Sequence, residues 1–137
     1  MVAGRLPESR PDRKVAKVLV TYMDVRVASF NTGVASPALA GVATGQALTD
    51  VQGRAAELNQ LGLRTVGDMV VHVDEVETEG GEATLDACVD NATVDVDRRG
   101  RAVESPPAAY DVTATLVEVA DGAWLVGTLA AKPTESC

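Results

Sequence analysis

The stretch from residue 69 to residue 90, MVVHVDEVETEGGEATLDACVD, has the clearest structural pattern in this chain of 137 residues. Apolar and polar residues alternate through it with a period of two, which is typical of a β-strand with one buried face. Gly80 and Gly81 interrupt the alternation, and glycine readily supplies the positive φ that a tight hairpin requires. The stretch therefore predicts two antiparallel strands, over 65–78 and 83–97, joined by a hairpin turn at 79–82.

Two further strands follow the same pattern. A basic turn at 98–101 comes first, and Pro106-Pro107 then delays strand entry because proline has no N–H to donate to a ladder. Residues 110–118 alternate between apolar and polar types, Asp121-Gly122 is a strong hairpin signal, and 123–131 form the last strand. The second half of the chain thus predicts an antiparallel meander of four strands.

The first half of the chain has helical periodicity instead. Apolar residues recur at helical spacing over 12–31, which predicts a long amphipathic helix. Ser36-Pro37 suits the start of a second, brief helix that extends to about Gly45, since proline is favoured at the first helical position. A third helix is expected from there to Gly62, where glycine suits a left-handed cap. The predicted fold class is therefore α+β, with three N-terminal helices packed on the four-stranded sheet.

The composition bounds the organisation of the chain and its partners. A length of 137 residues with 46% hydrophobic content fits one domain over 12–137, and residues 1–11, without apolar periodicity, predict a disordered leader. The net charge of −8 argues against binding to nucleic acid or to an anionic membrane surface. The sequence contains neither a membrane span nor a signal-peptide pattern, so membrane attachment would need a tether missing from this chain.

The two cysteines, Cys88 and Cys137, have neither a metal-site spacing nor a redox CxxC spacing. A structural disulfide between them is the favoured interpretation, because an oxidised terminal cysteine can hold the end of the chain on the sheet. The alternative is two unrelated free thiols. A disulfide favours an extracytoplasmic protein, secreted or anchored in the cell envelope, and free thiols favour a cytoplasmic one.

The order of helices and strands, with the pattern Tyr110-x-Val112-x-Ala114-x-Leu116 followed by DGAWLV at 121–126, resembles the nuclear-transport-factor-2-like superfamily. It is similar in particular to small exported proteins and lipoproteins of that class from high-GC Gram-positive bacteria, in which a segment like 83–91 precedes a basic turn and a cysteine closes the chain. The resemblance implies a cone-like fold with a curved sheet. The class contains polyketide cyclases, isomerases and dehydratases as well as non-catalytic domains, so it does not select a function.

Enzymes of that class with acid/base activity use a histidine or an aspartate inside the cone. His72 is the one histidine of this chain, and Asp74 and Asp86 are the carboxylates expected near it. The alternation of the strands argues against a catalytic role, because it puts His72, Asp86 and Cys88 on the face opposite the apolar residues. His72, Asp74 and Asp86 are therefore only weak acid/base candidates, and no catalytic residue is assigned.

The sequence offers few other candidates for a site. Tyr22, Tyr110 and Trp124 could line a pocket, although scarce aromatic residues in an aliphatic core more often serve packing. The aspartates between 86 and 97 lack the glycine-interrupted loop of a calcium site, so no metal and no cofactor are expected.

The function that these features favour is a non-catalytic binding or accessory domain of an exported or envelope-anchored protein. Its ligand, a protein or a small molecule, is unknown. One alternative is a cyclase-type or isomerase-type enzyme with a cone-facing acid/base group. Another is a structural homodimer joined through the sheet faces.

Overall fold

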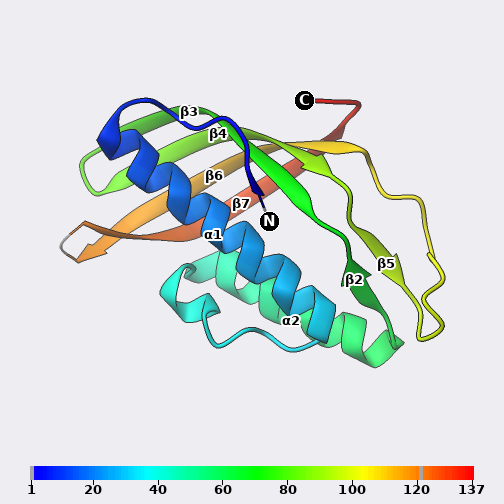
Figure 1. Cartoon of the computed structure of the whole chain (residues 1–137). Helices are drawn as coiled ribbons and strands as arrows, with labels where there is room; N and C mark the ends of the chain where they lie inside the picture. Colours follow the sequence, from blue (N-terminus) through cyan, green and yellow to red (C-terminus); the bar gives the residue numbers. More distant parts are fainter. Residues whose placement is uncertain (1, 121) are drawn as a thin grey trace.

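The computed structural model describes residues 2–120 and 122–137, in which a long helix crosses one face of a curved sheet (Figure 1). This helix, α1 (Arg10–Thr32), begins where the Ser9 hydroxyl accepts a hydrogen bond from the Asp12 amide at 3.3 Å. It ends at Gly33, which has a left-handed φ of 74°. The second helix, α2 (Gly45–Leu61), ends in the same way at Gly62. Both helices confirm the predicted periodicity, and α2 confirms the glycine cap predicted at Gly62.

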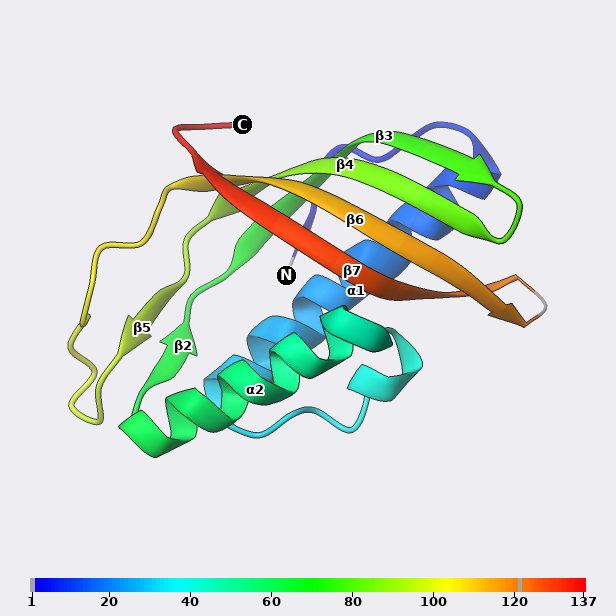
Figure 2. The same cartoon turned by 180° about the vertical axis from the view of Figure 1, so that it is seen from behind.

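The main sheet has the strand order β1-β3-β4-β6-β7, with β1 (Val2–Ala3) at one edge. Its long strands β3 (Met69–Glu79), β4 (Glu82–Asn91), β6 (Ala109–Ala120) and β7 (Ala123–Thr134) form the expected antiparallel meander. The hairpin between β3 and β4 turns at Gly80, which has a φ of 62°, as predicted. In the predicted turn between β6 and β7, Asp121 lies outside the described residues. Figure 2 shows the four long strands from the opposite side, with α1 running diagonally across them.

The prediction of three N-terminal helices on one four-stranded sheet is wrong. The expected second helix is only a 3-10 turn, η1 (Leu39–Gly41), because Pro37 and Gly41 leave too few residues between them for an α-helical stripe. A separate two-stranded sheet pairs β2 (Arg64–Val66) with β5 (Val94–Val96). Two of the four predicted strands are thus each divided into two.

Close backbone contact explains that division. Gly67 lies between β2 and β3 with a φ of 101°, and a Cβ built there would be 2.1 Å from the Ala92 carbonyl oxygen. Ala92 is itself in the break between β4 and β5, and its amide donates to the Asp68 carbonyl at 2.9 Å. The two interruptions therefore face each other, and the smaller sheet diverges from the larger one at this point, as Figure 1 shows.

The segment before α1 also differs from expectation. Residues 1–11 are predicted to be a disordered leader, of which Met1 lies outside the described residues. In the structure, β1 (Val2–Ala3) pairs in parallel with β3, and the Gly4 amide donates to the Val71 carbonyl at 2.8 Å. Backbone pairing of this kind leaves no apolar periodicity in the sequence, so the residue pattern does not indicate it.

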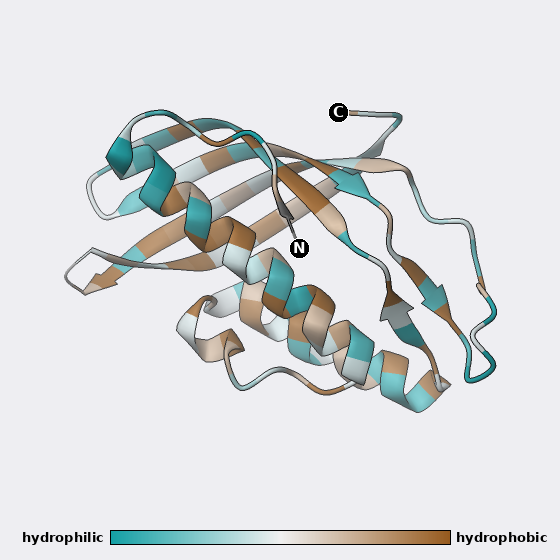
Figure 3. Cartoon of the chain, viewed as in Figure 1, coloured by the Kyte–Doolittle hydropathy of each residue, from teal (hydrophilic) through white to brown (hydrophobic). Residues whose placement is uncertain are grey.

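The core lies between the helices and the sheet face that α1 covers, which we call the inner face. Figure 3 shows hydrophobic residues alternating with hydrophilic ones along the strands and along α1. Leu19 of α1, Leu58 of α2 and Leu85 of β4 are all fully buried in one hydrophobic cluster. Burial of each such side chain contributes about 1.5–3 kcal/mol to stability. Within the described residues, neither helix combines the length and apolar character needed to cross a membrane.

Candidate ligand-binding site

A partly open cavity of about 200 Å3 lies between α1 and the inner face of the sheet. Helices and strands from both halves of the chain form its wall. Its apolar lining consists of Met23, Val27, Phe30, Met69, Val89, Val112, Leu129 and Ala131. Pockets for drug-sized ligands measure roughly 300–1,000 Å3, so this one suits a smaller molecule.

One ion pair neutralises most of the charge on the cavity wall. Arg54 of α2 places its Nη2 atom 2.8 Å from Oδ2 of Asp95 in β5. The Thr65 hydroxyl of β2 donates to the other oxygen of Asp95 at 2.6 Å, and Arg54 also pairs with Glu57. The Asp95 side chain is only 19% exposed. Each of its two oxygens therefore already has a partner on the cavity wall.

Arg26 provides a second positive charge on the wall. It is half-buried on α1, and its guanidinium carbon lies 5.0 Å from the centre of the Phe30 ring, in cation–π geometry. Among residues 2–120 and 122–137, no carboxylate lies within ion-pair distance of Arg26. The cavity thus contains one cationic group whose charge is not balanced by a contacting acid.

Of the three aromatic residues predicted to line a pocket, Tyr110 lines this cavity. Burial raises the pKa of its hydroxyl, the Arg26 charge lowers that pKa, and Asp95 and Glu104 raise it. The net shift is upward, so the phenol remains protonated at neutral pH. Tyr110 therefore presents an O–H donor in the field of Arg26.

The other two predicted pocket aromatics do not line this cavity. Tyr22 is fully buried and donates its hydroxyl proton to the Ala47 carbonyl at 3.0 Å, which connects α1 to α2. Burial raises the pKa of Tyr22, although the nearby Arg26 guanidinium partly lowers it. Trp124 is half-buried and packs against the hydrophobic core from β7. Both side chains serve packing.

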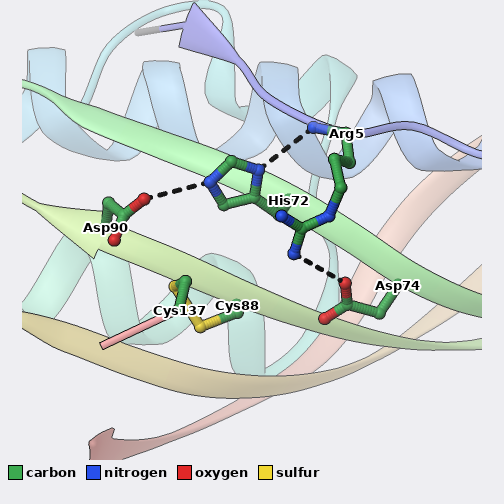
Figure 4. A network of polar contacts seen from close by, with 6 residues as sticks. All are labelled: Arg5, His72, Asp74, Cys88, Asp90 and Cys137. Carbon is green, nitrogen blue, oxygen red and sulfur yellow. Dashed lines mark hydrogen bonds and ion pairs between the residues drawn. A yellow bond between two sulfur atoms is a disulfide. The ribbon is translucent and has the colours of Figure 1, made fainter. Parts of the chain in front are cut away.

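His72 lies on the outer face of the sheet, away from the cavity, as the strand alternation predicts (Figure 4). Its Nδ1 atom accepts a hydrogen bond from the Arg5 amide at 3.1 Å, and its Nε2 atom lies 3.0 Å from Oδ2 of Asp90. The neutral tautomer with the proton on Nε2 satisfies both contacts. This arrangement holds the segment before α1 against β3.

Asp74 and Asp86 do not join His72 in a catalytic group. Asp74 falls at a register shift in β3 and pairs with Arg5 at 3.2 Å. Asp86 lies opposite Glu75 across the hairpin, and its carboxylate accepts a hydrogen bond from the Thr113 hydroxyl at 3.3 Å. The carboxylate that contacts His72 is Asp90, which the register of the hairpin determines and which sequence reasoning did not pair with it. Across the described residues, no group of three or more His, Cys, Asp or Glu side chains is arranged to hold a metal ion.

The predicted disulfide is present. Cys88 of β4 and Cys137 are joined, with their Cα atoms 5.7 Å apart (Figure 4). Because β6 lies between β4 and β7, the bond brings the C-terminal tail across the outer face from β7 to β4. The alternative of two free thiols does not hold.

Comparison with known proteins identifies a fold and no function. No sequence profile of a known family matches the chain, and no curated protein matches it in sequence. The crystal structure of the intermembrane-space region of the chloroplast protein ARC6 is similar, with a TM-score of 0.72 and 19% identity over 93% of this chain and 100% of that one. This likeness shows a shared α+β fold.

A second solved structure, a de novo designed protein with a curved β-sheet, is similar at a TM-score of 0.45. Its identity is 9%, over 85% of this chain and 97% of that one, and such a likeness establishes no relationship. The resemblance to the nuclear-transport-factor-2-like class stays a prediction.

Sequence reasoning missed Arg26 and Arg54 as cavity residues, and it considered Asp95 only as a metal ligand. One local signal was present, because Arg26 lies between Met23 and Phe30 at helical spacing on the apolar side of α1. The pairing of Arg54 with Asp95 spans 41 positions and depends on the separate β2–β5 sheet. No pattern in the sequence indicated that sheet.

Proposed function

We propose that this chain is a non-catalytic binding domain of an exported or envelope-anchored protein, related to the nuclear-transport-factor-2-like class. Its ligand site is the cavity between α1 and the inner face. The observation that supports this proposal is an apolar cavity in which the carboxylate of Asp95 is already bound by Arg54 and Thr65. Such a wall can hold a ligand, and among its described residues the one carboxylate is already committed to Arg54 and Thr65.

The same geometry weighs against a cyclase or isomerase. A general base must lie within hydrogen-bonding reach of the proton that it removes. His72 lies on the outer face of the sheet, and both of its ring nitrogens have partners. Tyr110 does contact the cavity, but its raised pKa keeps it protonated at neutral pH, so it can donate a proton and not accept one.

A structural dimer joined through the outer face is less favoured. Asp86, Asp90 and Asp111 are exposed there on neighbouring strands. Two copies packed face to face would have to desolvate these carboxylates together with Lys132, which lies opposite Asp111 in β7, and such burial of charged groups is costly.

Two observations support the extracytoplasmic part of the proposal. The Cys88–Cys137 disulfide suits an oxidising compartment. The similar structure from ARC6 is described as the intermembrane-space region of that chloroplast protein. We infer a comparable accessory role for this chain.

A matched pair of variants tests the proposed site. Ala131 of β7 lines the cavity, and its neighbour Ala130 is exposed and pairs with Thr113 on the outer side. Ala131→Trp should cover the cavity mouth, whereas Ala130→Trp adds the same side chain to the opposite face. The probe is benzyl alcohol, a neutral ligand with one aromatic ring, and binding is followed by amide chemical shifts in NMR.

We expect saturable shifts at cavity residues such as Val89 and Val112 in the wild type and in Ala130→Trp. Ala131→Trp should abolish them while keeping the wild-type spectrum elsewhere. The proposal is wrong if benzyl alcohol does not bind the wild type, or if its shifts persist unchanged in Ala131→Trp.

A further inference from the structure

We propose that the cavity selects a small monocarboxylate whose apolar body is about the size of one aromatic ring, with Arg26 as the carboxylate-binding residue. This inference rests on the proposed function and names the chemical class of its ligand. Tyr110 would provide a second donor to the carboxylate.

The position of Arg26 is unusual for so acidic a chain. Acids outnumber Lys and Arg by 20 to 12, yet no described carboxylate is within ion-pair distance of Arg26. Its half-buried guanidinium stands over the Phe30 ring on the cavity wall. The guanidinium also interacts with the Tyr22 hydroxyl through a side-chain hydrogen bond. Stacking on the Phe30 ring orients the planar group, and its remaining N–H donors match the two oxygens of a carboxylate.

Tyr110 lies where it can complete such a site. Its side chain also lines the cavity, and the Arg26 charge acts on its hydroxyl. A protonated phenol beside a guanidinium can donate to the same carboxylate that the guanidinium binds. Two donors from α1 and β6 would therefore converge on one anionic group.

The other charges on the wall, together with Glu104 near Tyr110, favour a ligand with a single negative charge. Arg54 and Asp95 compensate each other, so they add little net attraction for an anion. Asp95 and Glu104 both act on the Tyr110 hydroxyl as negative charges. A dianion such as a phosphate monoester should bind less well, because only one uncompensated cation would offset its two negative charges. A cationic ligand should bind poorly, because Arg26 would repel it and the described wall has no unpaired carboxylate to bind it.

The shape of the cavity determines the rest of the ligand. Its volume of about 200 Å3 is enclosed largely by aliphatic and thioether side chains, with Val89 and Val112 on the sheet side and Met23 on the helix side. Burying an apolar body there is favourable in proportion to the apolar area removed from water. A ring or a short branched chain fills this volume, and a long acyl chain does not.

The test compares three probes that share one aromatic ring, namely benzoate, benzyl alcohol and benzylamine. In the wild type at low salt, benzoate should bind about tenfold more tightly than benzyl alcohol, since a charge-assisted contact at a half-exposed site is worth roughly 1.4 kcal/mol. Benzylamine should bind most weakly. Added salt should weaken benzoate and leave benzyl alcohol unchanged.

Arg26→Met removes the charge and keeps an unbranched apolar side chain on α1. It should reduce the preference for benzoate over benzyl alcohol to about one, with benzyl alcohol binding retained. Arg10→Met is the matched control, because Arg10 is exposed at the start of the same helix and its loss changes the net charge equally. This control should keep the tenfold preference.

The outcomes separate this inference from the function on which it rests. If benzyl alcohol binds and benzoate binds no better, the cavity is a ligand site but the carboxylate preference is refuted. A preference that survives in Arg26→Met, or that is equally lost in Arg10→Met, also overturns the role of Arg26. If none of the probes binds, the proposed site itself fails and the inference fails with it.

Discussion

Replacing Cys137 with serine should destabilise the protein by about 4 kcal/mol. The disulfide joins residues 49 positions apart, and the chain-entropy relation for a closed loop of that length gives about 4 kcal/mol at 25 °C. Cys137 is exposed at the end of the tail, so serine removes little packing. The loss therefore reports mainly the constraint on the unfolded chain. For a chain of this size it corresponds to a fall in Tm of roughly 12–16 °C.

Urea unfolding at pH 7, followed by circular dichroism, measures the effect on three forms of the protein. These are oxidised wild type, reduced wild type and Cys137→Ser, the last two in the presence of reductant. The two forms without the bond should agree with each other. Ser136→Ala, a change beside the bond at another exposed position, should unfold like the oxidised wild type. A difference below about 1 kcal/mol between oxidised and reduced protein would refute the reasoning, because the unfolded chain would then gain little freedom from reduction.

Two further predictions concern alkaline pH and the division between the sheets. Burial raises the pKa of Tyr22 above 10.0, so the folded state keeps this proton longer than the unfolded state. The free energy of unfolding should therefore be unaffected by this group below pH 10.0 and fall above it. Tyr22→Phe should reduce that fall. The same variant should cost about 1 kcal/mol at pH 7, because it loses the hydrogen bond to the Ala47 carbonyl. Titration of unfolding between pH 8 and 11 checks the slope, and an equal slope in both proteins would contradict it. Gly67→Ala should destabilise by roughly 3 kcal/mol or more, because its Cβ would meet the Ala92 oxygen at a left-handed φ. Gly53→Ala, in open space on α2, should instead stabilise the protein slightly. Thermal unfolding measures the Tm of both variants. Equal Tm values would show that backbone contact at Gly67 is unimportant.

The site was less predictable than the fold, for a physical reason. His72 and Asp86 could be placed on the outer face from sequence alone, since strand alternation assigns each residue to one side of a sheet. The cavity could not be found in this way. Its polar groups come from α1, α2, β2, β5 and β6, and only tertiary packing brings Arg26, Asp95 and Tyr110 to one wall.

By itself the sequence determined the features that depend on local spacing. The period of the apolar residues specified α1, α2 and the four long strands, and Gly62 and Gly80 specified where two of them end, because glycine tolerates positive φ. With only two cysteines, the one intramolecular disulfide that the sequence allows joins Cys88 and Cys137, and the structure contains that bond. Tertiary structure alone decided the separate β2–β5 sheet, the pairing of β1 with β3 and the composition of the cavity wall. Each of these depends on contacts between backbone or side-chain groups far apart in the chain, and such contacts leave no periodic pattern in the residues that make them.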